Sequence, residues 1–363
     1  MESRFTQNNL REQRKPRFSL PALLLAALLT PLLTTLLAGL LPAPAARAAE
    51  VNVYSYRQPF LIEPLLERFT KETGIKANVV FAPKGLIERL KREGKRSPAD
   101  LLLTSDIGRL IAAADANVLQ KVDSPALRAN IPAQYRHSEG LWFGLTVRVR
   151  AVFASRERVP QGALSTYEDL ADPRWKGRIC TRSAQHVYNI SLMASMIAHH
   201  GEAGASRWAK GLLDNLARKP QGNDRAQVRA IYSGECDIAL VNTYYMGKML
   251  EDPKQVPWAE SVYIYFPGQN GQGNGAHVNI SGGGVTAAAP HRAEAIRLLE
   301  FLSSDWAQNA YAAQNHEYPV KPGVEPSPLV KSWGSYRADP LPLETVARQH
   351  PQAVRLYDQV GFP

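Results

Sequence analysis

Hydrophobic and polar positions along this chain follow two periods in turn, one typical of strands and one typical of helices. Short apolar or alternating runs predict strands, and apolar residues three or four positions apart predict helices. In the first part of the chain we expect strands at 51–55, 75–81 and 99–103 and helices at 59–71, 85–92 and 107–116. Strand and helix repeating at this spacing predict parallel strands joined by right-handed crossovers.

The same α/β pattern continues beyond residue 145. The strand expected at 146–155 carries Arg148 and Arg150, and alternate positions of a strand place both guanidinium groups on one face. Further strands are expected at 178–182, 236–242, 262–266 and 277–280, and helices at 187–200, 202–216, 226–232, 291–302 and 345–360. A chain of this length exceeds what one hydrophobic core usually serves, so two lobes are expected.

The start of the chain has the pattern of a secretory signal peptide. A basic stretch is followed by an almost wholly apolar run, residues 20–41, and then by Ala46-Arg47-Ala48, an A-x-A cleavage pattern. We therefore predict that residues 1–48 are a cleaved signal peptide. The alternative is a retained membrane anchor, because the apolar run is long enough to span a bilayer.

The charge of the chain overstates how basic the working protein is. The whole sequence has 43 Lys and Arg against 33 Asp and Glu, and residues 1–48 hold six of the former and two of the latter, so the remainder carries a net charge of +6. These positive charges are spread out. Nucleic-acid binding requires a clustered basic face, so no nucleic-acid partner is expected.

The two cysteines, Cys180 and Cys236, are expected to form a disulfide. Export would place them in an oxidising compartment, where a pair of cysteines tends to close. Their spacing is too wide for a cysteine metal site. The alternative is that both are buried thiols that pack as small apolar residues.

Two consecutive tyrosines, Tyr244 and Tyr245, close an apolar run that is typical of a buried strand. A phenol has a pKa of about 10 in water and is normally neutral. A trivalent cation carries enough charge to deprotonate it, and the resulting phenolate is a hard oxygen ligand. The pair is therefore a candidate ferric site, although paired tyrosines also serve simply as packing aromatics.

Motifs that mark common enzymes are absent from the sequence. It contains no G-x-G-x-x-G after a strand, no phosphate-binding GKS/T loop, no HExxH and no G-x-S-x-G. We expect a binding protein and no enzyme.

Five motifs, in this order, resemble those of periplasmic ferric-iron-binding proteins, which serve ABC importers. They are residues 51–57, 168–177, 234–237, 242–245 and 275–282. The resemblance implies an α/β, two-lobed periplasmic binding protein fold of type II, similar to a transferrin lobe. Two crossover strands, near 145–150 and 277–284, would form the hinge. Lobe 1 would comprise 49–147 plus 281–363, and lobe 2 would comprise 148–280.

The resemblance also implies a set of site residues. Tyr188, Tyr244 and Tyr245 match three tyrosine ligands of iron. Arg57 matches an arginine that holds a synergistic anion, carbonate or bicarbonate, and Arg148 is expected to add to that pocket, with Arg150 as the alternative. A guanidinium fork suits a planar anion.

In one place the sequence departs from relatives that have His and Tyr ligands directly after the arginine. Gln58 and Pro59 stand there, and the proline side chain cannot bind a metal. The chain thus resembles the subclass with three tyrosines plus anion or water. Tyr56 and Gln58 are additional candidates from lobe 1.

As a function, the resemblance implies a monomeric periplasmic protein that captures Fe(3+) and delivers it to an ABC permease in the inner membrane. Fold does not fix ligand, so a binding protein of the same fold for an oxyanion, a polyamine or a thiamine-like cation is the main alternative. A secreted redox enzyme with tyrosinate-bound iron and an adhesive protein are the others, and no sequence feature favours either.

Overall fold

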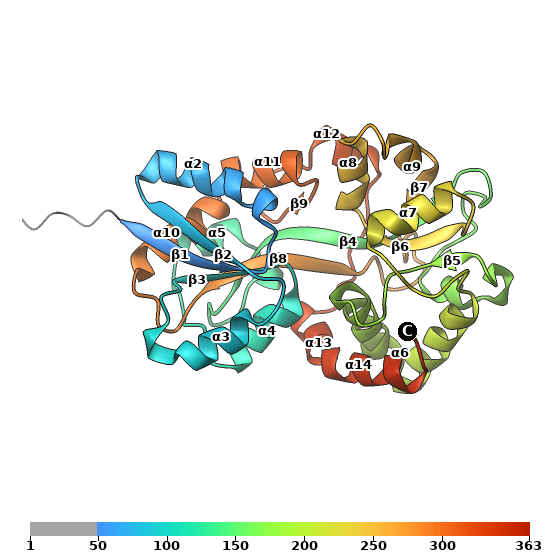
Figure 1. The fold of residues 1–363 in the computed structure, drawn as a ribbon, viewed down its shortest axis with the longest axis horizontal. Helices are drawn as coiled ribbons and strands as arrows, with labels where there is room; N and C mark the ends of the chain where they lie inside the picture. The colour runs from blue at the N-terminus through green and yellow to red at the C-terminus, as the bar shows by residue number, and fades with distance from the viewer. Residues whose placement is uncertain (1–48) are drawn as a thin grey trace, which may run out of the picture. The chain divides into compact units, whose positions relative to one another are not determined.

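The computed structural model describes residues 49–363, which form one mixed α/β unit (Figure 1). The predicted signal peptide, residues 1–48, lies outside the described residues. The strands are β1 (Glu50–Ser55), β2 (Lys76–Phe81), β3 (Leu101–Thr104), β4 (Phe143–Ser155), β5 (Ile179–Cys180), β6 (Ile238–Asn242), β7 (Val262–Tyr265), β8 (Val278–Val285) and β9 (Tyr318–Pro319). They are hydrogen-bonded in the order β2-β1-β3-β8-β4-β6-β5, and β7 and β9 also pair with β4.

The long strand β4 belongs to two groups of strands. Its first part, Phe143–Val149, pairs antiparallel with β8, and its second part, Arg150–Ala154, pairs antiparallel with β6. All thirteen of its residues are buried. We call the elements around β1–β3 the first half and those around β5–β7 the second half. Figure 1 shows β4 and β8 running between the two halves, as expected of crossover strands.

The parallel pairing predicted for the first half is confirmed. β1 pairs in parallel with both β2 and β3, and β5 pairs in parallel with β6. The lobe boundaries expected at 147/148 and 280/281 fall within β4 and β8, and they remain a prediction.

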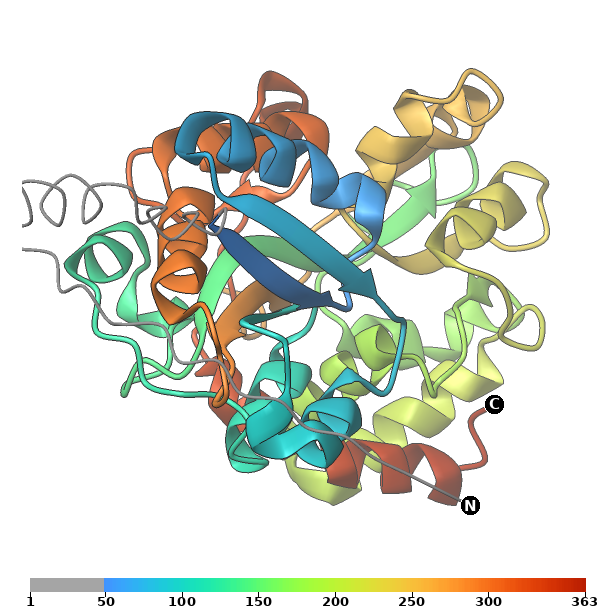
Figure 2. The same ribbon diagram turned by 60° about the vertical axis from the view of Figure 1, so that its left-hand side comes forward.

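Helices cover the strands of both halves (Figures 1 and 2). Those beside the first half are α2 (Glu63–Thr73), α3 (Leu86–Glu93), α4 (Ile107–Asp115), α5 (Pro125–Asn130), α10 (Arg292–Leu302) and α11 (Asp305–Gln314). Those beside the second half are α6 (Val187–Asp214), α7 (Asp224–Tyr232), α8 (Tyr244–Leu250), α9 (Val256–Glu260) and α14 (His350–Gln359). The remaining helices are α12 (Pro328–Ser332) and α13 (Leu343–Arg348), and short 3-10 turns lie at Pro59–Leu61, Gly94–Arg96, Ala133–Tyr135, Glu168–Ala171 and Pro173–Trp175. Among residues 49–363, no helix is both long enough and apolar enough to cross a membrane.

The sequence predicts no helix for α5, α9, α11 or α12, and two of its other predictions were wrong. The sequence predicts one helix over 345–360, whereas the structure ends α13 at Arg348 and begins α14 at His350, with Pro351 in the first turn of α14. The sequence also places Tyr244 and Tyr245 at the end of a strand, whereas they occupy the first turn of α8. Aromatic residues favour strands intrinsically, and tertiary packing overrides that preference here.

The apolar side chains form two buried clusters. One includes Phe69, Leu103 and Phe143 of the first half and extends to Val241 and Met249 in the second half. The other includes Trp175, Leu192 and Tyr357, between the second half and the helices α6 and α14. The first cluster thus continues from the first half through β4 and β6 to α8, and the second cluster belongs to the second half alone.

Candidate functional site

The second half positions two tyrosines at the start of α8. The buried strand β6 ends at Asn242, whose backbone N–H donates to the Asp224 carboxylate at 2.8 Å. Thr243 is fully buried, and its N–H donates to the carbonyl of Val149 on β4 at 3.0 Å. These bonds fix the point at which the strand becomes a helix, so Tyr244 and Tyr245 project from the first turn of α8. Their rings stack, with centroids 4.3 Å apart.

The third tyrosine comes from α6. His186 caps this helix, and its Nδ1 accepts a hydrogen bond from the backbone N–H of Tyr188 at 3.2 Å. The hydroxyl oxygens of Tyr188 and Tyr244 lie 3.0 Å apart and share a hydrogen bond. The three tyrosines that the sequence predicts as ligands thus lie together, although 56 residues separate Tyr188 from Tyr244.

All three tyrosines line a cavity of about 750 Å³ that both halves contribute to. Its other walls include Arg57, Gln58 and Arg109 from the first half. The charged residues that line it are Arg57, Arg109, Arg148, Arg182, Arg225, Lys248, Glu251, Asp252 and Glu317. Six of these nine are basic, so the cavity favours an anionic ligand or a cation that arrives with anions.

No group of three or more His, Cys, Asp or Glu side chains within residues 49–363 is arranged to hold a metal ion. The phenols are therefore the clustered hard oxygen donors of this cavity. A metal bound to them would need a high charge, because it must displace the phenol protons.

Burial opposes that loss of protons. It raises the pKa values of Tyr244 and Tyr245 well above their ordinary range, and the neighbouring Tyr188 adds to the rise. Burial, together with the nearby Arg182 guanidinium, lowers the pKa of His186 to about 3. At neutral pH both phenols of α8 and the imidazole of His186 are accordingly uncharged.

Three arginines surround the ring of Tyr188. The guanidinium carbons of Arg148, Arg150 and Arg182 lie 5.5, 5.8 and 5.2 Å from its centroid. Arg148 and Arg150 reach the same ring from alternate positions of β4, which confirms that they share a face. Sequence reasoning did not single out Arg182, because nothing in its local sequence connects it with Tyr188.

The three arginines differ in how fully they are paired. Arg150 donates to Asp224 at 2.7 Å and to Asn189 at 2.8 Å, so it serves the buried framework. Arg182 also binds Asp224, at 3.1 Å, and it lines the cavity. Arg148 donates to the Ser281 hydroxyl at 3.1 Å and to the carbonyl of Ser105, both neutral, so its charge has no carboxylate partner in these contacts.

Arg57 lies in the cavity wall as predicted, but its guanidinium fork is already paired. It forms a buried ion pair with Glu317, with one nitrogen on each carboxylate oxygen. The ring of Tyr311 lies beneath it, 5.2 Å from centroid to guanidinium carbon. Glu317 was missed from the sequence, because 260 residues separate it from Arg57 and no local motif marks it.

The two additional candidates from the first half are placed differently. The hydroxyl of Tyr56 accepts the backbone N–H groups of Leu86 and Ile87, at 2.9 and 3.0 Å, at the start of α3. Its oxygen is therefore engaged, and we leave Tyr56 out of the ligand set proposed below. Gln58 is exposed and lines the cavity, so its amide can reach a ligand there.

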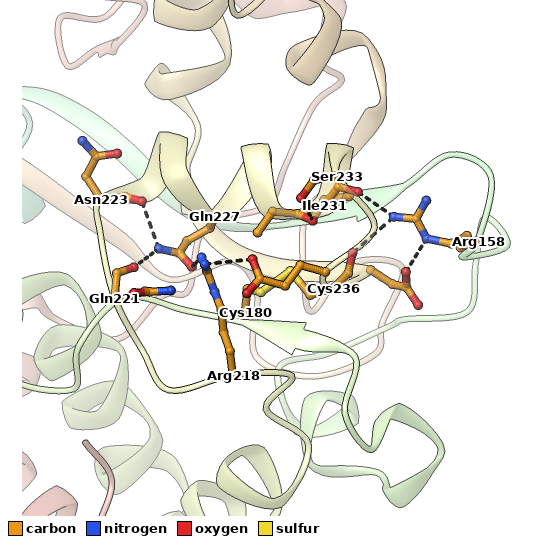
Figure 3. Close-up of a disulfide and its surroundings, with 12 residues drawn as sticks. Arg158, Cys180, Arg218, Gln221, Asn223, Gln227, Ile231, Ser233 and Cys236 are labelled. Carbon is orange, nitrogen blue, oxygen red and sulfur yellow. Dashed lines mark hydrogen bonds and ion pairs between the residues drawn. A yellow bond between two sulfur atoms is a disulfide. The ribbon is translucent and has the colours of Figure 1, made fainter.

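The predicted disulfide between Cys180 and Cys236 is present in the structure (Figure 3). It joins β5 to the turn before β6. Arg218 pairs with Glu235 at 2.9 Å beside it, and Arg158 donates to the carbonyl of Cys236 at 3.2 Å. The disulfide thus ties the strand that leads toward Tyr188 to the strand that leads to Tyr244.

Comparisons with known proteins show which proteins this chain resembles. Residues 96–332 match the family described as bacterial extracellular solute-binding proteins. The chain is 44% identical to iron uptake protein A1 of Synechocystis sp., over 86% of this chain and 87% of that protein. Among solved structures it resembles the apo ferric ion-binding protein A of Pasteurella haemolytica, with a TM-score of 0.83, 51% identity and coverage of 87% and 98%. It also resembles a Trichodesmium protein in complex with iron and citrate ligands, with a TM-score of 0.82, 43% identity and coverage of 87% and 100%.

Proposed function

We propose that this chain, which belongs to the family of bacterial extracellular solute-binding proteins, captures ferric iron and passes it to an ABC permease. Its relatives are binding and transport proteins, and members of this family work with ABC transporters. Its structure has the two-lobed type II fold of the ferric-binding proteins it resembles, as the sequence predicts. On this proposal it acts as a monomer in the periplasm, after removal of residues 1–48, and the permease lies in the inner membrane.

The observation that carries the proposal is the cluster of three phenols. Tyr188 and Tyr244 already place their oxygens 3.0 Å apart, and Tyr245 stacks on Tyr244 in the same cavity. We propose that iron replaces the protons of these three hydroxyls. Three phenolates balance the charge of Fe(3+), so the bound metal no longer carries a net positive charge into a basic cavity.

A synergistic anion, carbonate or bicarbonate, would complete the coordination. Arg148 is proposed to hold it, because its charge lacks a carboxylate partner and lies beside Tyr188. Arg182 lies 5.2 Å from the centroid of the same ring and adds positive charge. Arg57 is proposed to take part from the first half once its pairing with Glu317 is shared with the anion.

The excess of basic residues also separates this proposal from its alternatives. A polyamine or a thiamine-like cation would enter a cavity that repels it, whereas an oxyanion would be attracted. An oxyanion carrier is therefore the second candidate, and it requires no role for the tyrosines.

The test is a visible absorption spectrum of the mature protein before and after addition of ferric citrate with bicarbonate. We expect a tyrosinate-to-iron charge-transfer band that is absent in the Tyr244→Phe/Tyr245→Phe double variant. A colourless wild-type protein would overturn the ferric proposal and favour the oxyanion carrier. A band of equal strength in the double variant would show that iron binds elsewhere.

A further inference from the structure

A short connection from the first half, residues 314–317, packs directly against the helix that carries two of the tyrosines. It joins α11 to β9, and β9 pairs with β4 at Thr146 and Val147. It contacts Gly247 and Lys248 of α8 and the residue that follows this helix, Glu251. We call it the 314–317 segment.

The closest contact of this segment depends on a glycine. A methyl group built at Gly247 of α8 would lie 2.2 Å from ring carbons of His316, a separation that real side chains do not show. The ring of His316 therefore occupies the space that any larger residue at position 247 would need.

His316 itself adopts an unusual backbone conformation. Its φ is 55°, in the left-handed region that residues other than glycine rarely enter. Such a conformation costs free energy and persists where the surroundings determine it, often beside functional sites. Here the surroundings are α8, the residue Glu251 and the first half, and the conformation directs the imidazole onto Gly247.

Two polar contacts reinforce this packing. The Nε2 of His316 lies 2.8 Å from a carboxylate oxygen of Glu251, just after the end of α8. Lys248 donates to the carbonyl of Gln314 at 2.7 Å. The segment thus contacts Gly247 and Lys248 of α8 and Glu251 just after its end.

The same segment fixes Arg57. Glu317 follows His316 directly, and its carboxylate holds the guanidinium fork of Arg57 in a buried ion pair. Arg57, Glu317, Tyr244 and Tyr245 all line the one cavity. Residues 316 and 317 therefore connect the tyrosine helix on one wall with the arginine on the other.

We propose that the 314–317 segment sets the position of Tyr244 and Tyr245 relative to Arg57, with Gly247 and His316 as positioning residues that do not touch the ligand. This inference rests on the proposed function, because it says that the 314–317 segment contributes to the affinity of the same site for iron. Because Tyr244 and Tyr245 both lie on α8, a displacement of this helix moves two phenol oxygens at once.

The first test variant is Gly247→Ala, which places a methyl group against His316. We expect its affinity for iron, measured from the charge-transfer band in competition with citrate, to fall on the order of tenfold or more, as displacements near one ångström do at preorganised sites. In Gly247→Ala/His316→Ala the ring is gone, so the affinity should return to that of His316→Ala alone. His316→Ala introduces no clash, so its iron affinity can be measured even if Gly247→Ala folds poorly.

The matched control is Gly211→Ala on α6. A methyl group there would lie 2.7 Å from the Ala171 side chain, remote from the cavity. It should lower the thermal stability and leave the iron affinity unchanged. If both variants lose iron affinity only in proportion to their loss of thermal stability, the segment has no positioning role.

A second readout requires no iron. Amide hydrogen exchange of residues 244–250 should rise in Gly247→Ala and return toward the His316→Ala level in the double variant. A wild-type protein that takes up no iron would overturn the proposed function. The inference about the 314–317 segment would then be tested by this exchange pattern alone. Wild-type exchange and wild-type affinity in Gly247→Ala would overturn the inference while leaving the proposed function intact.

Discussion

At the residue scale, the buried pair of Arg57 and Glu317 shows what a single charge costs in this cleft. Replacing Glu317→Gln would leave a buried guanidinium without its carboxylate. We expect the free energy of unfolding to fall by about 3 kcal/mol, the usual range for breaking a buried ion pair from one side. Urea denaturation measures it, with the exposed pair of Arg68 and Glu72 as control. Glu72→Gln should change stability by less than about 0.5 kcal/mol.

The same variant reports on the anion. Glu317→Gln removes the negative charge but keeps the size of the side chain, so an anion from solution can supply the missing charge. Added bicarbonate should therefore restore part of the stability of Glu317→Gln and leave the wild type nearly unchanged. A variant that does not respond to bicarbonate would show that Arg57 is closed to anions and would leave Arg148 and Arg182 as the anion site.

The tyrosines predict the pH dependence of iron binding. Because burial raises the pKa values of Tyr244 and Tyr245, the free protein holds these protons at neutral pH, and the bound state has lost them. Iron binding must release protons, so the affinity rises with pH and falls as pH drops. Calorimetry in buffers of different ionisation enthalpy should count one proton fewer for Tyr188→Phe than for the wild type at the same anion concentration. Equal proton counts would exclude Tyr188 as a phenolate ligand.

At the element scale, the disulfide connects the two strands that lead to the tyrosines. It closes a loop of 56 residues, so its removal in Cys180→Ser/Cys236→Ser should lower the free energy of unfolding by about 4 kcal/mol in the chain-entropy model. The folded variant should still bind iron, because Thr243 and Asn242 retain their own backbone contacts. Thermal unfolding with and without a reductant measures the first effect, and the charge-transfer band the second. Loss of the band in a folded variant would mean that the disulfide positions the tyrosines.

The elements also show how far sequence reasoning reaches. The hydrophobic period predicts β1 and α2, and a short continuous apolar run predicts β3, whose four residues are all buried. It misses α8, because Tyr244 and Tyr245 follow an apolar strand and resemble its continuation. The tyrosines could be predicted as a group from their motifs, but the contacts that orient them could not. Glu317 lies 260 residues from Arg57, and only the folded chain brings the two together.

At the scale of the whole molecule, the distribution of charge across the cleft predicts that iron closes it. Iron bound by three phenolates and a divalent carbonate carries a net negative charge. The opposite wall presents Arg109 beside the paired Arg57 and Glu317, so it keeps a net positive charge. Opposite charges attract most strongly where water is excluded. Ligand binding therefore favours a conformer in which the two halves approach, with β4 and β8 as the connections that bend.

Small-angle X-ray scattering of the mature protein should show a smaller radius of gyration with ferric iron and bicarbonate than without. Tyr244→Phe/Tyr245→Phe should keep the apo value under both conditions. Arg109→Gln provides the discriminating case: Arg109 lines the cavity from the first half and stacks on Tyr56, 4.2 Å from guanidinium carbon to ring centroid, with none of the three tyrosines as its partner. This variant should bind iron and give the charge-transfer band but compact less, because the attraction between the walls is weaker. Full compaction in Arg109→Gln would show that closure depends on Arg57 and the hinge and does not need Arg109. If the wild type binds iron without any compaction, the tyrosine wall holds the metal alone in an open cleft.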